Sequence, residues 1–486
     1  NNMTEQSVRL LVFAVRRRVV LKYFGVLLLS MAPMAAVPVL VALHGEAYES
    51  ANRFALVALL LMIVGGGLAR ITAPQKIQIN EALVVTALAF LIAAVSMAWP
   101  LMADGLAPLD ALLEATSGVT TTGLSVLPTV EGHSSTFLFA RAWLQWYGGL
   151  AITVLALAFI LAPSAATRRL AGIETDAAEL VTGTRWRARQ VLAVYVALTL
   201  AGVALLWLAG AAPFDALIHV LAAVSTGGFS GYDRLSSLGP WPTLAVLALI
   251  MLFGATSFSL QYRAWSAGPR LLYADLEVRA LWLGCLITFA ALVACFAFAG
   301  PVRLADAAFL AISAQTTTGF ANTPVSELPA AAQLVLIVSM GIGGDMGSTA
   351  GGIKILRWLV LIRLLQLLFA RTAVPRHAVI EPYVAGRRLN GVELEAAIGI
   401  VTAYALAALL SWLPFLLYGV APLAGLFEVV SALSTCGLSA GVASPELHPL
   451  LKIVLCADML MGRVEVMAFL ILIYPRTWWG RTTEEA

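Results

Sequence analysis

Long apolar stretches, separated by shorter polar connections, run along the whole chain. A membrane-spanning helix needs roughly 20 mostly apolar residues. Ten stretches come close to or exceed this length, at about 19–43, 54–69, 82–102, 137–162, 191–210, 241–262, 280–300, 331–369, 392–419 and 449–474. The pattern predicts an all-α, polytopic membrane protein. A basic cluster leads into the first stretch without a small-residue cleavage site, so we expect this span to be retained as an anchor.

The stretch at 331–369 is too long for one straight helix and is interrupted by glycines. They are Gly341, Gly343, Gly344, Gly347, Gly351 and Gly352. Each glycine in a helix interior costs about 1 kcal/mol relative to alanine. We therefore predict that this helix breaks in mid-membrane; the alternative is that the glycines permit close helix packing.

Lysine and arginine are concentrated in alternate connections between the stretches. The basic connections are 9–22, 70–76, 168–189, 263–279 and 371–388. Because basic loops stay on the cytoplasmic side, we expect a multi-pass protein of the cytoplasmic (inner) membrane with both termini in the cytoplasm. These loops are also candidate contacts for anionic lipid or for a cytosolic partner.

The composition agrees with a membrane protein. Hydrophobic residues make up 60% of the 486 positions and charged residues 12%, whereas about 25% is usual in soluble domains. The mean hydropathy is +0.90. The net charge of +3 is accounted for by the basic loops, so no nucleic-acid partner is expected.

Four similar runs rich in hydroxyl side chains end on a glycine. They are SGVTTTGL (117–124), AAVSTGGF (222–229), SAQTTTGF (313–320) and SALSTCGL (431–438). The glycines Gly123, Gly228, Gly319 and Gly437 are 105, 91 and 118 residues apart. A repeat of this length indicates internal pseudosymmetry, and the predicted orientation puts all four runs toward the outer side.

Each run is preceded by an apolar stretch of about ten residues, which is too short to cross a membrane. Asp110, Asp215 and Asp306 lie 13 residues before their glycines, and Ala424 has this place in the fourth repeat. An acid at a helix start is favoured by the helix dipole, whose negative end then points at the run. The pattern predicts four re-entrant half-helices that present a cation-attracting end.

Threonine and glycine suit a loop that binds cations through its backbone. Glycine tolerates conformations closed to other residues, and small hydroxyls satisfy nearby backbone groups. Carbonyl oxygens can replace the hydration shell of an alkali cation. One chain would supply a whole pore, from four pseudo-symmetric, K⁺-channel-like helix–pore-loop–helix repeats and two N-terminal transmembrane helices. We expect the boundaries 1–80, 81–165, 186–265, 276–372 with a gate loop, and 390–486.

Further motifs follow the first, third and fourth runs: RAWLQWYGGL (141–150), GIGGDMGSTAGGIKILR (341–357) and MLMGRVEV (459–466). With the four runs, they resemble the potassium-translocating subunit of the Trk/Ktr/HKT superfamily, and the two additional N-terminal spans favour the Trk type. The resemblance implies potassium uptake by a homodimer in which each protomer has its own pore. It also implies a TrkA-like cytosolic nucleotide-binding ring that regulates the pore. K⁺ is the transported ion, and no organic cofactor is expected in this chain.

The resemblance also assigns a selectivity filter that binds K⁺ mainly through backbone carbonyls. Its residues are Thr120, Thr121, Thr122, Gly123, Ser225, Thr226, Gly227, Gly228, Thr316, Thr317, Thr318, Gly319, Ser434, Thr435, Cys436 and Gly437. Gly227 and Cys436 replace the threonine of the other two loops, so strong discrimination against Na⁺ does not follow from the sequence.

A gate and a pore charge are implied as well. The gate loop under the filter comprises Gly347, Ser348, Thr349, Ala350, Gly351, Gly352 and Lys354. Arg463 lies in an apolar stretch, where a charge costs at least ~2.5 kcal/mol unless it is paired or hydrated. The resemblance places Arg463 in the pore; the alternative is an ion pair with Glu465 or Asp458.

Polar residues near the runs are expected to have supporting roles. Glu114, His219 and Glu428 lie nine residues before their glycines and are predicted to support the filter by hydrogen bonds, with Leu310 in the third repeat. Arg141, Trp143, Gln145 and Trp146 are predicted to anchor the following span at the outer interface.

Other functional classes stay open as alternatives. A less selective K⁺/Na⁺ pathway, or a secondary transporter coupled to H⁺ or Na⁺, differs from a pore in mechanism, although inverted repeats would favour the latter and these repeats share one orientation. A membrane-embedded enzyme is remote, because the sequence has neither a metal-binding cluster nor a GxSxG or phosphate-loop motif. The chain is therefore not expected to be an enzyme.

Overall fold

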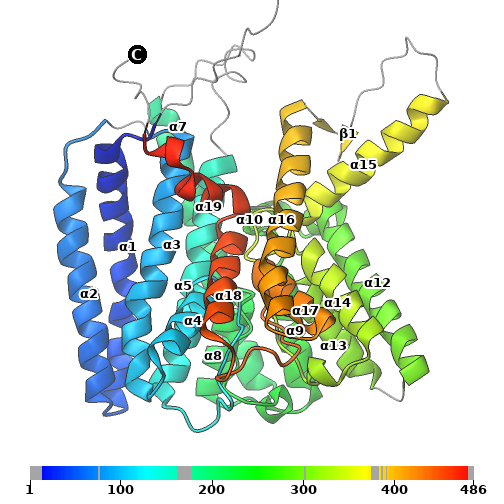
Figure 1. The fold of residues 1–486 in the computed structure, drawn as a ribbon, viewed down its shortest axis with the longest axis horizontal. Helices are drawn as coiled ribbons and strands as arrows, with labels where there is room; N and C mark the ends of the chain where they lie inside the picture. Colours follow the sequence, from blue (N-terminus) through cyan, green and yellow to red (C-terminus); the bar gives the residue numbers. More distant parts are fainter. Residues whose placement is uncertain are drawn as a thin grey trace, which may run out of the picture.

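Long apolar helices standing side by side make up most of the protein (Figure 1). The computed structural model describes residues 14–74, 77–160, 177–299, 303–373, 383–384, 387–389 and 391–479. The predicted all-α class holds apart from a small antiparallel pair, β1 (Tyr383–Val384) with β2 (Arg387–Arg388). Both chain ends and residues 161–165, the end of the first predicted repeat, lie outside the described residues.

Two N-terminal helices form a layer at one side of the molecule. Helices α1 (Arg17–His44) and α2 (Tyr48–Ala69) form an antiparallel pair that packs against α3 (Ile79–Leu101) (Figure 1). Gly25 of α1 and Gly65 of α2 let the two backbones approach closely, because a β-carbon at either position would meet the opposite helix within 3.0 Å.

The remaining helices follow one order four times. A long helix leads to a short helix of 12 residues, a loop and a returning helix. The long helices are α3, α7 (Ala177–Leu208), α12 (Leu276–Ala299) and α16 (Gly391–Leu417), and the short ones are α4 (Pro108–Val119), α8 (Pro213–Val224), α13 (Leu304–Gln315) and α17 (Pro422–Leu433). The predicted acids Asp110, Asp215 and Asp306 lie in the first turns of the short helices.

Three of the four returning segments are broken. The first is the single helix α5 (Ser135–Ile160), and the others are α9 (Trp241–Gly254) with α10 (Phe258–Ala267), α14 (Ala330–Ile342) with α15 (Ile355–Thr372), and α18 (Pro449–Arg463) with α19 (Val466–Ile473). The short helix α11 (Arg270–Ala274) and the 3₁₀ turns Met102–Asp104, Leu235–Leu238, Val325–Glu327 and Pro475–Thr477 complete the chain.

Not every predicted apolar stretch forms one continuous helix. Within the described residues six helices are long and apolar enough to cross a membrane, or seven if the bent pair α9–α10 is one span. The break in 331–369 was predicted, but those in 241–262 and 449–474 were not. Helix α10 turns by 99° from α9, and the side chain of Gln261 satisfies the carbonyls of Phe253 and Thr256 at the bend.

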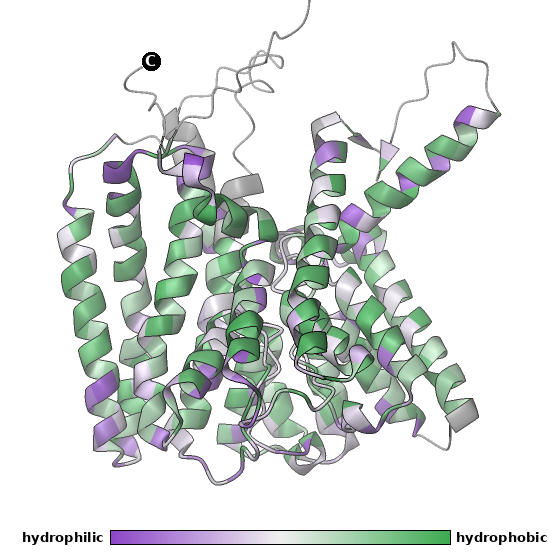
Figure 2. Ribbon diagram, in the orientation of Figure 1, coloured by the Kyte–Doolittle hydropathy of each residue, from purple (hydrophilic) through white to green (hydrophobic). Residues whose placement is uncertain are grey.

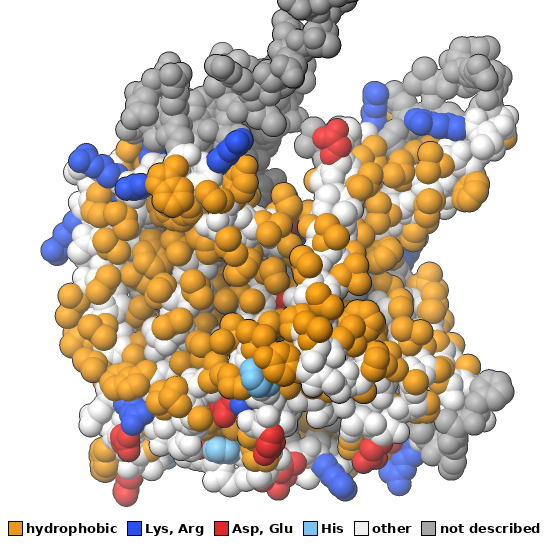
Figure 3. Space-filling model, viewed as in Figure 1, with side chains coloured by type: hydrophobic (Ala, Val, Ile, Leu, Met, Phe, Trp, Pro, Cys, Tyr) orange, Lys and Arg blue, Asp and Glu red, His pale blue; other side chains and the backbone are white. Residues whose placement is uncertain are grey.

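Hydropathy and charge divide the molecule into bands. Apolar residues fill the middle, and polar residues gather toward both ends (Figure 2). On the face shown in Figure 3, Lys and Arg dominate the end at which β1 lies in Figure 1, and most of the acids lie at the opposite end. We call these the basic end and the acidic end. An apolar belt between polar ends is what a bilayer requires of a membrane protein.

Candidate functional site

The four threonine and glycine loops share one backbone shape. Each begins at the C-cap of a short helix, where Thr120, Ser225, Thr316 and Ser434 have φ from −82° to −78°. The next residue is left-handed: Thr121, Thr226, Thr317 and Thr435 have φ of 54°, 50°, 51° and 46°. The closing glycines have φ of 85°, 76°, 87° and 84°. A β-branched residue at positive φ is held there only by its surroundings.

This alternation of hand orients the loop carbonyls. In an extended strand, successive carbonyls point to opposite sides, whereas residues of alternating right and left hand turn successive carbonyls toward the same side. A row of carbonyls on one side is the arrangement that can replace an ion's hydration shell.

Contacts between the loops form a closed ring. A β-carbon added to Gly123 would collide with the carbonyl oxygen of Gly227 in the second loop. The same relationship joins Gly228 to Thr318, Gly319 to Cys436, and Gly437 back to Thr122. The four predicted loops therefore surround one axis in chain order, although their role as K⁺ ligands stays a prediction.

In three of the loops a hydroxyl side chain hydrogen-bonds to another hydroxyl side chain. The hydroxyls of Thr120 and Thr122 are 2.7 Å apart, and those of Thr316 and Thr318 are 2.8 Å apart. In the fourth loop, where Cys436 replaces the last threonine, the Ser434 hydroxyl bonds the Tyr404 hydroxyl at 2.6 Å instead.

The second loop is held by Gln145, a side chain for which the sequence predicts a place at the membrane interface. Its Nε2 donates to the Gly227 carbonyl at 2.6 Å, and its Oε1 accepts from the Phe229 amide at 3.1 Å. A β-carbon on Gly227 would collide with the Gln145 amide group. The glutamine therefore fills the space that a threonine side chain takes in the first and third loops.

Arg141 lies one helical turn before Gln145 and is also buried rather than interfacial. Its Nε is 3.0 Å from Glu114 Oε2, and its guanidinium lies 3.8 Å from the centre of the Phe229 ring. The prediction that these two residues anchor the span at the interface is wrong, because α5 turns this polar face toward the loops. The sequence carried a signal for this, since positions four apart share one face of a helix.

Three short helices are joined to the segment that follows their loop. Glu114 accepts from the Ser125 hydroxyl at 2.5 Å, His219 from the Ser230 hydroxyl at 3.1 Å, and Glu428 from the Ser439 hydroxyl at 2.6 Å. Each serine lies two residues after the loop glycine. In the third repeat the equivalent residues are Leu310 and Ala321. The predicted hydrogen-bonded support is thus present in the three repeats that have polar residues there.

The predicted gate loop lies against the ring. Residues 343–354 are non-helical between α14 and α15. The Gly351 amide donates to the Thr317 hydroxyl at 2.6 Å, and the Gly352 amide donates to the Ser434 carbonyl at 3.1 Å. The Thr349 hydroxyl bonds the carbonyls of Val224 and Gly254 at 3.0 and 2.9 Å.

The loop ends at Lys354, which has φ of 78° and precedes α15. Its ammonium group donates to the Ala350 carbonyl within the same loop. The segment therefore contacts the second, third and fourth repeats at once, and its charged end folds back on it.

Arg463 is buried beside the gate loop. Its guanidinium donates to the Thr349 carbonyl at 2.7 Å and to the Gly148 carbonyl at 3.3 Å. Neither acid of the ion-pair alternative binds it: Glu465 pairs with Arg357 at 2.7 Å, and Asp458 accepts from the Ser411 hydroxyl. The ion-pair alternative is therefore wrong. Arg357, for which the sequence predicts no role, holds α15 against the start of α19.

Cavities open on both sides of the ring. One of about 280 Å³ is lined by Gly228, Gly319 and Gly437 and by the segments that follow them. The other, of about 380 Å³, is lined by the gate loop together with Lys354 and Arg463. The ring and the gate loop thus separate two spaces large enough for hydrated ions.

Comparison with known proteins places the chain in a family. The sequence profile of the TrkH family, described as a cation transport protein, matches residues 50–283 and 291–477. An uncharacterized cation transporter of Methanocaldococcus jannaschii is 29% identical over 86% of this chain and 87% of its own length. The Trk system potassium uptake protein TrkH of Escherichia coli (strain K12) is 32% identical over 76% of this chain and 79% of its own.

A solved structure shares the fold. The crystal structure of the potassium transporter TrkH from Vibrio parahaemolyticus superimposes with a TM-score of 0.83 at 27% sequence identity, covering 96% of this chain and all of the other. The names of the relatives indicate transport rather than catalysis. The chain therefore belongs to the TrkH family of cation transport proteins.

Proposed function

We propose that the chain takes up potassium across the cytoplasmic membrane through a gated pore at the centre of the loop ring. The observation that carries this proposal is the cyclic contact of the four loops, from Gly123 around to Gly437 and back to Thr122. A closed ring with carbonyls on one side supplies oxygen ligands at several levels without any carboxylate. Alkali cations are selected in this way in channels.

The short helices add an electrostatic reason for a cation. Their C-terminal ends meet at the ring, and each carries a partial negative charge from its macrodipole. The names of the relatives support potassium as the transported cation, because they are called potassium uptake proteins and a potassium transporter.

The gate in this proposal is the predicted gate loop, residues 347–352 with Lys354, together with Arg463. The segment hydrogen-bonds to three repeats, and Arg463 holds its Thr349 carbonyl. A fixed positive charge next to the pathway raises the energy of a cation there. The loop and the charge together would restrict flow until the segment moves.

Regulation would come from outside the chain. We propose a homodimer with one pore in each protomer, controlled by a TrkA-like cytosolic nucleotide-binding ring. The basic end, which Figure 3 shows rich in Lys and Arg, would then be cytoplasmic and would face this ring and anionic lipid.

A less selective or coupled pathway is the second candidate. It is favoured by the differences between the loops, since Gly227 and Cys436 replace threonine. Gln145 supports the second loop and Tyr404 supports the fourth. A coupled transporter would move K⁺ with H⁺ or Na⁺ through the same ring.

Flux into proteoliposomes tests the proposal. Proteoliposomes that contain the purified protein and a high internal K⁺ concentration should accumulate ⁸⁶Rb⁺, because K⁺ efflux makes their interior negative, and excess external K⁺ should suppress the uptake. Imposing H⁺ or Na⁺ gradients separately should leave the driving force unchanged for a pore and change it for coupled transport. Folded protein that carries no Rb⁺ or K⁺ under any gradient would overturn the proposal.

A further inference from the structure

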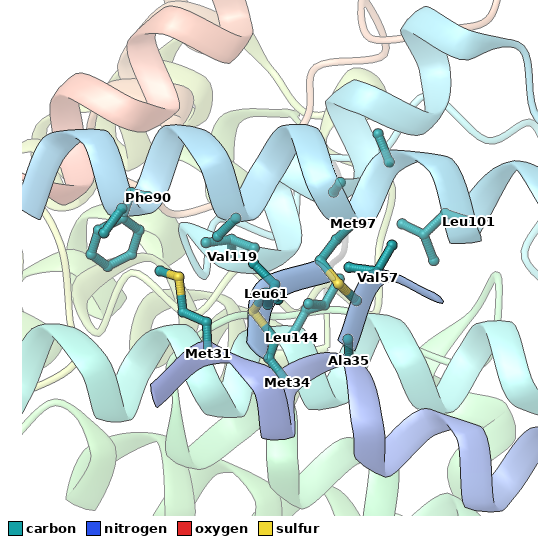
Figure 4. Packing of buried hydrophobic residues seen from close by; sticks show 14 of the residues in the cluster. Met31, Met34, Ala35, Val57, Leu61, Phe90, Met97, Leu101, Val119 and Leu144 are labelled. Atoms are coloured by element: carbon teal, nitrogen blue, oxygen red, sulfur yellow. The ribbon is translucent and has the colours of Figure 1, made fainter. Parts of the chain in front are cut away.

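A cavity of about 210 Å³ lies away from the loop ring, between the N-terminal helices and the first repeat. It is walled by α1, α3, the end of α4 and α5. Figure 4 shows Met31 and Met34 of α1 with Phe90 of α3 and Val119 of α4 in this region. Neither the ring nor the gate loop uses this space.

The depth of the cavity places it in the apolar belt. It is lined by Leu27 to Met34 in the middle of α1, by Ala89 to Ala93 in the middle of α3, and by Tyr147 to Val154 in the middle of α5. Solutes at this depth are overwhelmingly lipid acyl chains, because the hydrocarbon core of a bilayer is about 30 Å thick and excludes polar molecules.

The lining gives water or an ion little to bind. The polar side chains among the lining residues are those of Ser30 and Tyr147. The Tyr147 hydroxyl donates to the Ser30 carbonyl, and the Ser30 hydroxyl donates to the Leu27 carbonyl at 2.7 Å. A buried water needs two to four polar partners, and these groups are already bonded to one another or to the backbone.

The α1 and α5 walls of the cavity include accessible residues. Ser30 is exposed, and Leu150, Ala151 and Val154 are half-buried, whereas Met34 and Phe90 on the inner wall are 1% and 3% exposed. A flexible apolar chain can therefore enter between α1 and α5 and reach side chains that surrounding lipid does not contact.

We propose that this cavity is a binding site for one acyl chain of a membrane lipid. Burying an apolar chain against apolar walls is favoured by dispersion contacts that an empty space forfeits. The expected occupant is a lipid tail, because the cavity lies in the apolar belt.

The inner wall of the site adjoins the first loop. Val119 is the last residue of α4 and precedes Thr120. Gly148 packs so closely on the Val119 carbonyl that a β-carbon would collide with it, and the Gly148 carbonyl accepts from Arg463. A bound acyl chain would thus contact the residues that support both the first loop and the pore charge.

Photo-labelling tests the proposal directly. The full chain is reconstituted with phosphatidylglycerol that carries a diazirine in the middle of one acyl chain, and labelled residues are mapped by mass spectrometry. We expect adducts on Met34 and Phe90, in addition to those on exposed lipid-facing residues such as Leu59 and Leu60 of α2. Adducts on Leu59 and Leu60 with none on Met34 or Phe90 would overturn the proposal, including the case in which a second copy of the chain covers the entrance.

A filled cavity provides the matched comparison. Ala151→Phe should reduce labelling of Met34 and Phe90 at least fivefold, whereas Leu60→Phe on the exposed face of α2 should leave it unchanged. Ala151→Leu serves if the phenylalanine variant does not fold, with an expected reduction of at least twofold. Labelling that is unaffected in folded filled variants would contradict the assignment. The assay needs no ion flux, so a failure of the proposed transport function would be seen separately.

Discussion

The side-chain amide of Gln145 lies 2.6 Å from the carbonyl oxygen of Gly227 and occupies the space that a side chain at position 227 would need. Gly227 does not have positive φ, unlike Gly228 beside it. A glycine is therefore needed at position 227 because there is no room for a side chain, and not because of the backbone conformation. The second loop thus lacks a threonine side chain at this position, and Gln145 of α5 fills the space in its place.

Exchanging these two residues tests that compensation. Gly227→Thr alone should destabilise the protein and reduce K⁺ flux, because the new side chain collides with the glutamine amide; overpacking of this kind costs about 1–3 kcal/mol. Gln145→Ala together with Gly227→Thr should recover part of both the flux and the melting temperature. A double variant no better than Gly227→Thr would contradict the space-filling role.

Gln145→Leu isolates the hydrogen bonds from the packing. The change keeps most of the volume but leaves the buried Phe229 amide without its acceptor, at a cost of about 1–3 kcal/mol. We expect a lower K⁺/Na⁺ permeability ratio, because the Gly227 carbonyl is no longer held. Bi-ionic reversal potentials in planar bilayers measure it, and an unchanged ratio in folded protein would show that the bond does not set the carbonyl position.

Because the loops touch at their glycines, we expect even a methyl group added to a loop glycine to reduce ion flux strongly. Gly319→Ala should abolish most ⁸⁶Rb⁺ flux, since its methyl group collides with the Cys436 carbonyl and the residue has φ of 87°. Gly132→Ala is the matched control, because Gly132 has φ of 103° with no atom within 4 Å of the added methyl group. If both variants lost the same share of ⁸⁶Rb⁺ flux, the cause would be backbone strain and not a collision within the ring.

Arg463→Gln should raise the rate of cation flux by removing a fixed positive charge next to the pathway. The glutamine amide can keep one hydrogen bond to the Thr349 carbonyl. Lys452→Gln is the control on the same helix, because this buried lysine binds Asp110 at 2.5 Å, away from the gate loop. Stopped-flow flux in proteoliposomes compares them, and a rate for Arg463→Gln at or below that of the unmodified protein would contradict the barrier role.

Thr349→Val tests whether the gate loop is held by its hydroxyl contacts. Valine keeps the shape but loses the bonds to the Val224 and Gly254 carbonyls, so the closed position should be less stable and basal flux should rise. Ser348→Ala removes a hydroxyl that bonds within its own loop, to the Asp345 carbonyl at 2.7 Å, and should change basal flux much less. Equal basal fluxes in the two variants would count against the gate assignment.

The sequence predicted the parts of the fold that repeat. The short helices with an acid in the first turn, the four loops and the glycine-rich break all follow from local composition, and each is present. The kink after α18 was not predictable in this way, because Glu465 takes φ of 63° without a glycine at that position. Only its contact with Arg357, which is 108 residues away in the chain, shows what holds it.

The supporting side chains were harder to place than the loops. Arg141 and Gln145 lie among aromatic residues, a composition typical of a membrane interface. Their burial depends on which face of α5 turns toward the second loop, and that is decided by tertiary packing. The contacts of Arg463 were likewise undecidable from sequence, since Glu465 and Asp458 were both near enough in the chain to pair with it.

We expect the ring of four loops to conduct K⁺ in preference to Na⁺. The most direct measurement is the reversal potential of the purified protein in a planar bilayer with K⁺ on one side and Na⁺ on the other. For a permeability ratio of ten, we expect a shift on the order of 60 mV toward the K⁺ equilibrium potential, which Gly319→Ala would abolish together with the current. A reversal potential at zero, or a K⁺ current unaffected by Gly319→Ala, would contradict it.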